Sequence, residues 1–212
     1  MADLDFIYKR KSIRKFKDQE VPKEDLMEML KAATYAPSAK NQQNWHFTVI
    51  TNKDKIEEIA KVVADRHTEI ADLAEEEKDR DNMNKFLKYY TVFKNAPVLV
   101  LFYAKSYKSI EYKILNDKPE CKDLYDIAIS SKSEIQTIGA AIENFLLAAA
   151  NMGYGACYMT GPIHSKDKIY EIIGHDESEG ELMALVPVGV PEDKEAPQPK
   201  RLPLEDVVTF ID

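Results

Sequence analysis

The chain has 212 residues, of which 44% are hydrophobic and 31% are charged, and these values are ordinary for a folded protein with a buried core. Its formal net charge is −8, from 29 Lys and Arg against 37 Asp and Glu. This acidic balance argues against a nucleic-acid-binding protein, because affinity for phosphate backbones depends on Lys and Arg side chains.

Helical and strand patterns alternate along the first half of the chain. Residues 3–10 are expected to form a short amphipathic helix with Asp3 as its N-cap, and a second helix has Pro22 in its first turn. This second helix ends before Pro37, because the residue preceding a proline avoids helical angles. The later predicted elements are a strand over 45–50, a helix over 53–67, a charged and solvated stretch over about 72–84, and a helix over about 83–94.

The second half contains the most apolar segments. Residues 96–103 form a continuous apolar run, which is typical of a strand buried on both faces. Residues 105–126 are irregular and polar, and the wider stretch 105–130 is interpreted as an excursion that serves as a lid. The longest predicted helix, 133–152, is apolar nearly all round, so we expect it in a core or an interface. The remaining elements are a strand over 156–159, a helix over 166–174, a strand over 182–189, and an extended, proline-rich C-terminal arm over 191–212.

No repeat or second domain interrupts this order, so residues 1–212 are interpreted as a single α/β or α+β domain with a central sheet. Cys121 and Cys157 suit neither a disulfide framework nor a metal site, and Cys157 is interpreted as a buried thiol. The acidic N-terminal residues do not resemble a secretory signal, and every apolar run is shorter than the roughly 20 residues that span a bilayer. We therefore expect a cytoplasmic protein with no membrane partner.

A basic cluster at residues 9–15 follows the first predicted helix. Between two helices its backbone is expected to be extended, which points Arg10, Ser12 and Arg14 to one side. Two guanidinium groups and a hydroxyl on one face suit a phosphate dianion. Taken alone, a solvated basic patch explains the cluster at least as well.

Three further segments carry groups that suit a ligand. The loop over 36–45 holds a hydroxyl and four carboxamides, which donate and accept hydrogen bonds as the imide edge of a heteroaromatic ring requires. A capped polar turn is the alternative interpretation of this loop. Lys200 and Arg201 lie in the tail, where solvent exposure is the simpler interpretation. Thr160 and Gly161 follow a predicted strand, and the glycine permits close approach of the backbone to a ligand.

Together these segments resemble the nitroreductase family of flavoproteins. The matching motifs, in order, are Arg10-Lys11-Ser12-Ile13-Arg14, Ala36-Pro37-Ser38 with Asn41, Gln43 and Trp45, Ala96-Pro97, Gly153-Tyr154-Gly155, Val188-Gly189-Val190-Pro191 and residues 201–205. The similarity spans nearly the whole chain and is weakest over 105–130. Asn44 stands where the family usually has proline, Ala39-Lys40 replaces a common Ser-Gly pair, and the segment after Met159 matches only loosely.

The resemblance implies an α+β (α/β sandwich) fold, with a central mixed, mainly antiparallel sheet flanked by helices, in an intertwined homodimer with FMN at its interface. The FMN phosphate would be held by Arg10, Ser12, Arg14 and Arg201, with Lys200 beside them. Lys11 would face the pyrimidine side of the flavin or its ribityl chain, and Asn41 and Gln43 would bond the ring edge or the ribityl hydroxyls. Pro37 and Ser38 would come from the partner subunit and lie against the isoalloxazine. The backbone of Thr160 and Gly161 would approach flavin N5.

The family further implies an enzyme in which hydride passes from NADH or NADPH through the flavin to a small electron-poor acceptor, such as a nitroaromatic or a quinone, in a ping-pong cycle. No separate catalytic side chain and no metal are expected. The alternatives are another flavin chemistry (dehalogenation, enone reduction or flavin fragmentation), a non-catalytic FMN-binding redox module, and a helical interaction protein without a cofactor. The four histidines, His46, His67, His164 and His175, lack ligand spacing and are interpreted as surface or core residues.

Overall fold

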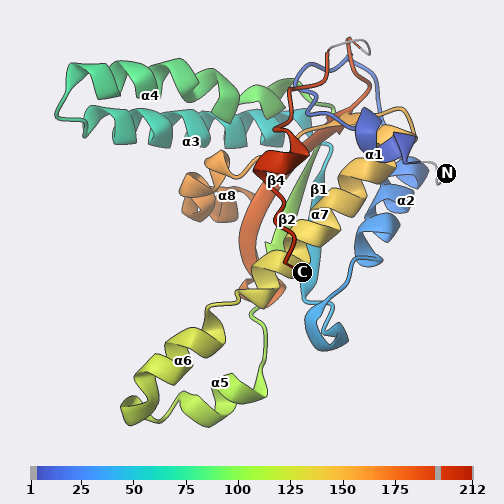
Figure 1. The fold of residues 1–212 in the computed structure, drawn as a ribbon. Helices are drawn as coiled ribbons and strands as arrows, with labels where there is room; N and C mark the ends of the chain where they lie inside the picture. Colours follow the sequence, from blue (N-terminus) through green and yellow to red (C-terminus); the bar gives the residue numbers. More distant parts are fainter. Residues whose placement is uncertain (1–3, 194–196, 212) are drawn as a thin grey trace.

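A four-stranded antiparallel sheet, in the order β1-β2-β4-β3, lies between two layers of helices in this computed structural model, which describes residues 4–193 and 197–211 (Figure 1). The central strands are β2 (Val98–Ala104) and β4 (Glu181–Gly189). The edge strands are β1 (Trp45–Ile50) and the two-residue β3 (Gly155–Ala156). An antiparallel sheet with interleaved helices makes the fold α+β.

The helices are α1 (Asp5–Lys9), α2 (Lys23–Thr34), α3 (Lys53–Asp72), α4 (Glu77–Tyr90), α5 (Ile110–Leu115), α6 (Lys122–Ile129), α7 (Ser133–Asn151) and α8 (Lys166–Ile173). Most of them occur close to the predicted positions, and α5 and α6 are the exceptions. The predicted N-cap Asp3 lies outside the described residues. The strand predicted over 156–159 is shorter, because only an isolated bridge between Met159 and Leu185 continues β3. No helix of the described part of the chain is both long and apolar enough to cross a bilayer.

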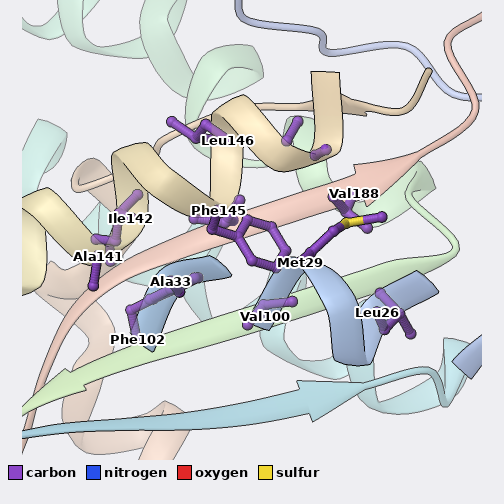
Figure 2. Packing of buried hydrophobic residues seen from close by; sticks show 14 of the residues in the cluster. Leu26, Met29, Ala33, Val100, Phe102, Ala141, Ile142, Phe145, Leu146 and Val188 are labelled. Carbon is purple, nitrogen blue, oxygen red and sulfur yellow. The ribbon is translucent and has the colours of Figure 1, made fainter. Parts of the chain in front are cut away.

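Each face of the sheet buries an apolar cluster. On one face, α2 and α7 pack against β2 and β4, and Figure 2 shows Phe145 of α7 between side chains of α2 and the sheet. On the other face, α3 and α8 cover the alternate residues of β2. All seven residues of β2 are buried, which confirms the prediction of a strand enclosed on both faces.

Residues 72–84 are exposed apart from the half-buried Ala74 and Met83, as the prediction of a solvated stretch requires. The predicted helix start at about residue 83 is wrong, because α4 begins at Glu77. This helix is charged on its outer side and runs antiparallel to α3 (Figure 1). The imidazole Nε2 of His67, which is buried in α3, lies 2.7 Å from the carbonyl oxygen of Met83 in α4. Packing between the two helices therefore orders a segment whose composition alone favours solvent.

The prediction of an irregular segment over residues 105–126 is also wrong, because α5 and α6 form there. The Ser109 hydroxyl caps α5 by accepting a hydrogen bond from Tyr112 N at 2.9 Å. The two helices pack mainly on each other and project beyond one end of the sheet (Figure 1). Their turns are too short, and too interrupted by charges, for a helical period to be visible in the sequence.

The extended backbone predicted for the basic cluster is confirmed, since Ser12 and Ile13 lie beside β3 and Phe16 bridges Pro191, just after β4. Ile13 N donates to the carbonyl oxygen of Ala156 at 2.9 Å, and Ser12 forms a parallel bridge with the same residue. A Cβ atom on Gly155 would lie 2.6 Å from Cβ of Ile13, which is closer than real Cβ contacts allow. Glycine at 155 is therefore required for the close approach of the two segments.

Replacing Gly155 with alanine is expected to lower the free energy of unfolding by about 1–3 kcal/mol, because the added methyl must displace Ile13. The matched control is Gly139→Ala in α7, where the added Cβ meets nothing within 4 Å. That control is expected to be neutral or to stabilise the protein by up to about 1 kcal/mol. Urea unfolding of both variants measures the difference, and a Gly155→Ala protein as stable as the wild type would contradict the packing described.

Candidate cofactor site

The basic cluster gathers its polar side chains around one buried thiol. Burial raises the pKa of Cys157, against the opposing influence of Arg14, Ser12 and Arg10, which all lie close enough to affect it. Ser12 and Arg14 are exposed, whereas Arg10 is half-buried, with its Nε 3.3 Å from Oε1 of Glu143 in α7. Three polar side chains therefore lie near one buried thiol at the β3 edge, and burial favours the neutral form of that thiol.

The C-terminal tail is attached to the start of this cluster through Gln198, which the sequence analysis did not identify. Its Nε2 donates to the carbonyl oxygens of Tyr8 and Lys9, both at 2.9 Å, and to that of Arg10 at 3.4 Å. These carbonyls end α1 and have no partner within that helix. A glutamine in a proline-rich tail gives no sequence signal for such a role.

The attachment brings the tail cations close to the N-terminal cluster. Lys200 and Arg201 are exposed, and the Arg201 side chain donates a hydrogen bond to the carbonyl oxygen of Pro199 at 3.2 Å. Arg201 follows Gln198 by three residues, and three residues of chain span at most about 11 Å. The guanidinium group is therefore within reach of the cluster that begins at Arg10.

The carboxamide loop has an unusual backbone. Lys40, Asn41 and Gln43 have φ values of 52°, 52° and 47°, in the left-handed region that non-glycine residues seldom occupy. Ser38 Oγ accepts a hydrogen bond from Gln43 N at 3.2 Å, and Gln43 Nε2 donates to Asn41 Oδ1 at 3.2 Å. The loop thus holds the exposed Asn41 and Gln43 side chains in fixed positions, and left-handed residues often accompany functional sites.

This loop and the basic cluster lie at opposite ends of the sheet in one chain. Trp45, which follows the loop, pairs with Ala104, and Ala104 pairs with Glu181 at the first residue of β4. Ala156, which contacts the cluster, pairs with Val188 near the last residue of β4. The two positions on β4 are separated by about 20 Å of strand. The structure therefore does not bring Pro37, Ser38, Asn41 and Gln43 next to the arginines of the same chain.

Two other carboxamides of the loop bond to the beginning of the excursion, and their role was not predicted. The side chain of buried Asn44 donates from Nδ2 to the Lys105 carbonyl oxygen at 2.6 Å. The backbone carbonyl oxygen of Asn44 accepts a hydrogen bond from Lys105 N at 2.7 Å. Gln42 donates from Nε2 to the Lys108 carbonyl oxygen at 2.8 Å, and its Oε1 accepts from Lys108 N at 3.1 Å. The one available signal was Asn44 itself, which departs from the proline usual in the family.

Thr160 and Gly161 lie just beyond the bridge that continues β3, at the start of a 3-10 turn over Gly161–Ser165. A Cβ atom on Gly161 would lie 2.6 Å from Cε1 of Tyr90. The glycine therefore makes room for an aromatic ring of the protein. Thr160 is exposed and lies on the same edge of the sheet as Cys157.

The histidines contact protein groups, in agreement with their interpretation as surface or core residues. Their partners are the Glu179 carboxylate for His46 at 3.1 Å, and the backbone carbonyl oxygens of Met83 for His67 at 2.7 Å, of Val63 for His164 at 3.4 Å and of Gly180 for His175 at 3.0 Å. Burial lowers the pKa of His164, which favours its neutral form.

Comparisons with known proteins agree with the motifs. A BluB-like flavoprotein from Clostridium difficile 630 is 40% identical, with 100% of each chain covered and a TM-score of 0.90. An iodotyrosine deiodinase structure bound to FMN and 3-iodo-L-tyrosine is 25% identical over 97% of this chain and 98% of that chain, with a TM-score of 0.69. A protein of Archaeoglobus fulgidus named "Putative NADH dehydrogenase/NAD(P)H nitroreductase" is 28% identical over 90% of this chain and 86% of its own length.

The family model described as "Nitroreductase family" matches residues 7–190, a span that includes the basic cluster, the carboxamide loop and every strand of the described sheet. The resemblance found from the motifs is thereby confirmed. The chain belongs to the nitroreductase family.

Proposed function

We propose that this protein is an FMN-dependent oxidoreductase that moves hydride from NADH or NADPH to a small electron-poor acceptor, such as a nitroaromatic or a quinone, in a ping-pong cycle. The observation that carries the proposal is the convergence of Arg10, Ser12 and Arg14 at the β3 edge in a chain of this family. Bound FMN would supply the hydride chemistry at its ring nitrogen N5, so the protein needs no nucleophile of its own.

The basic cluster fits a phosphate dianion. Arg10 keeps N–H groups for a phosphate while Glu143 holds its Nε, and Arg14 and the Ser12 hydroxyl are exposed beside it. The raised pKa of Cys157 keeps that thiol neutral, so it does not compete as an anion for the arginines. We assign the FMN phosphate to these three side chains and to Arg201 and Lys200 of the tail. Lys11, in the same segment, is assigned to the pyrimidine side of the flavin or to the ribityl chain.

The flavin ring would be held by groups from two chains. We assign its polar edge and the ribityl hydroxyls to Asn41 and Gln43, and its neighbouring face to Pro37 and Ser38 of a partner subunit. The separation of about 20 Å along β4 between this loop and the arginines of the same chain supports such a two-chain site. The backbone of Thr160 and Gly161, on the edge that carries the arginines, is assigned to the vicinity of N5.

A homodimer also accounts for exposed apolar surface. The tail presents apolar side chains that are largely exposed, among them Leu202, Leu204, Phe210 and Ile211, the last two at 86% and 95%. A hollow of about 530 Å³ between α1, α2 and α7 is lined by Phe6, Ala32, Tyr35, Asn144, Leu147, Ala148 and Asn151. Apolar surface of this kind usually marks an interface. We propose that a second copy of the chain covers both.

Reductive dehalogenation is the second candidate. It is favoured by the similarity to an iodotyrosine deiodinase, at 25% identity and a TM-score of 0.69. The FMN-holding residues would serve either reaction, and the excursion over residues 105–130 would determine which acceptor enters. Turnover of halogenated phenols and of nitroaromatics by the reduced protein separates the two candidates.

The purified protein is expected to be yellow, and acid is expected to release FMN and not FAD, since the chain has one phosphate cluster and no glycine-rich turn for a pyrophosphate. Stopped-flow mixing with NADH or NADPH should bleach the flavin within a turnover time, and an acceptor should restore its absorbance. A colourless protein would contradict the cofactor proposal. Flavin that neither nicotinamide reduces would indicate a non-catalytic module.

The variant Arg201→Ala is expected to weaken FMN binding by about ten- to a hundredfold, because a charge-assisted hydrogen bond to phosphate is worth roughly 1.5–3 kcal/mol. The matched control is Arg80→Ala, which also removes an exposed arginine bonded to a backbone carbonyl oxygen, that of Ala74 at 3.3 Å. Fluorescence titration of the apoproteins measures both affinities. Excess FMN should restore hydride transfer in Arg201→Ala, and wild-type affinity in that variant would remove Arg201 from the site.

The flavin-loaded protein is expected to be a dimer at micromolar concentration, because an apolar tail and an apolar hollow on one monomer favour association. Light scattering coupled to gel filtration measures the mass directly. Truncation before Leu202 should weaken the dimer and, with it, FMN binding. A stable monomer that retains FMN would contradict both the dimer and the two-chain site.

A further inference from the structure

Four hydrogen bonds join the carboxamide loop to the first residues of the excursion. Asn44 and Lys105 form one reciprocal pair, at 2.6 and 2.7 Å, and Gln42 and Lys108 form the other, at 2.8 and 3.1 Å. In each pair both segments donate once and accept once. We call these four bonds the clasp.

The clasp lies at the start of the excursion, which has few other contacts with the body of the protein. The helices α5 and α6 pack mainly on each other and project away from the sheet (Figure 1). Packing against the body of the protein therefore contributes little to their position. Lys105 and Lys108 lie in the backbone just after β2. This segment is the hinge about which α5 and α6 would move relative to the sheet.

The Gln42 side chain is suited to this role in both geometry and chemistry. The flanking left-handed residues Asn41 and Gln43 fix the direction in which it leaves the loop. Its Oε1 accepts from Lys108 N while its Nε2 donates to the Lys108 carbonyl oxygen, and a carboxamide offers this separate acceptor and donor side by side at neutral pH. A glutamine that bonds only to water does not need its acceptor and donor atoms to match two backbone groups of one residue.

We propose that Gln42 and Asn44 are positioning residues that hold the excursion over residues 105–130 in the place from which it closes over the flavin, and so set the affinity for the acceptor. This inference rests on the proposed function, in which the same loop contributes Asn41 and Gln43 to the flavin ring. One short loop would then place both the ring and the lid above it. An acceptor that contacts the lid would lose affinity when the clasp opens.

The first test is Gln42→Ala, because Gln42 is only half-buried while the buried Asn44 endangers folding when it is replaced. Loss of two hydrogen bonds is expected to speed amide hydrogen exchange at residues 105–109 by about tenfold. In the flavin-loaded dimer, KM for the acceptor should rise severalfold, while kcat and the FMN affinity stay within about twofold. Gln19→Ala, at an exposed glutamine outside the loop, is the matched control and should change none of these quantities.

The second test is Gln42→Glu, which makes the clasp sensitive to pH. A protonated carboxyl can donate to the Lys108 carbonyl and accept from Lys108 N, as the amide does, whereas a carboxylate repels that carbonyl oxygen. The closed clasp therefore raises the pKa of the introduced carboxyl above its ordinary value of about 4.3. Protection of the amides at residues 105–109 is present at low pH and is lost as the pH rises through the raised pKa of this carboxyl. Exchange corrected for its intrinsic pH dependence should match wild type below about pH 4 and approach that of Gln42→Ala near about pH 7.5.

Two results would overturn the inference. Unchanged exchange at residues 105–109 in Gln42→Ala would mean that the clasp does not hold the excursion. Faster exchange with an unchanged KM would mean that the excursion does not govern access of the acceptor. A wild-type chain that binds no FMN would contradict the proposed function. The exchange measurement can also be made on flavin-free protein, so the role of the clasp in holding the excursion would still be tested in that case.

Discussion

The close packing of Ser12 and Ile13 against β3 is the contact on which the candidate site depends. Because Gly155 has no side chain, Ile13 can lie directly on the β3 backbone and donate its amide hydrogen to Ala156. Side chains alternate along an extended segment, so this register turns Ser12 and Arg14 toward the opposite side, where they meet Cys157. A slip by one residue would direct the basic side chains into the protein and expose Ile13.

Carboxamide side chains join distant backbone segments at two points of the molecule. Gln198 satisfies carbonyl groups at the end of α1, and Gln42 pairs with both backbone groups of Lys108. In each case a glutamine side chain supplies the hydrogen-bond partner that a backbone group would otherwise find in a longer helix or strand. The N-terminal cluster, the tail, the loop and the excursion are therefore positioned by local hydrogen bonds, and the sheet provides the fixed frame between them.

Features that depend on composition over a long window could be predicted from the sequence, and features that depend on a single tertiary partner could not. The strand β2 was predictable because seven consecutive buried positions leave a continuous apolar run. The start of α4 was missed because its charged residues conceal a helix that α3 stabilises. The basic cluster was recognisable from residue types alone, whereas Gln42 and Gln198 are indistinguishable from solvated glutamines until their backbone partners are known.

The self-contained pairing of α5 with α6 has a consequence for how the protein can change over evolutionary time. Two helices that pack mainly on each other, and leave the sheet between Lys108 and α7, can vary in length and composition with little effect on the buried clusters. Under the proposed function, a chain built in this way can acquire a new acceptor preference through changes in these two helices while its sheet and the basic edge at β3 are inherited unchanged.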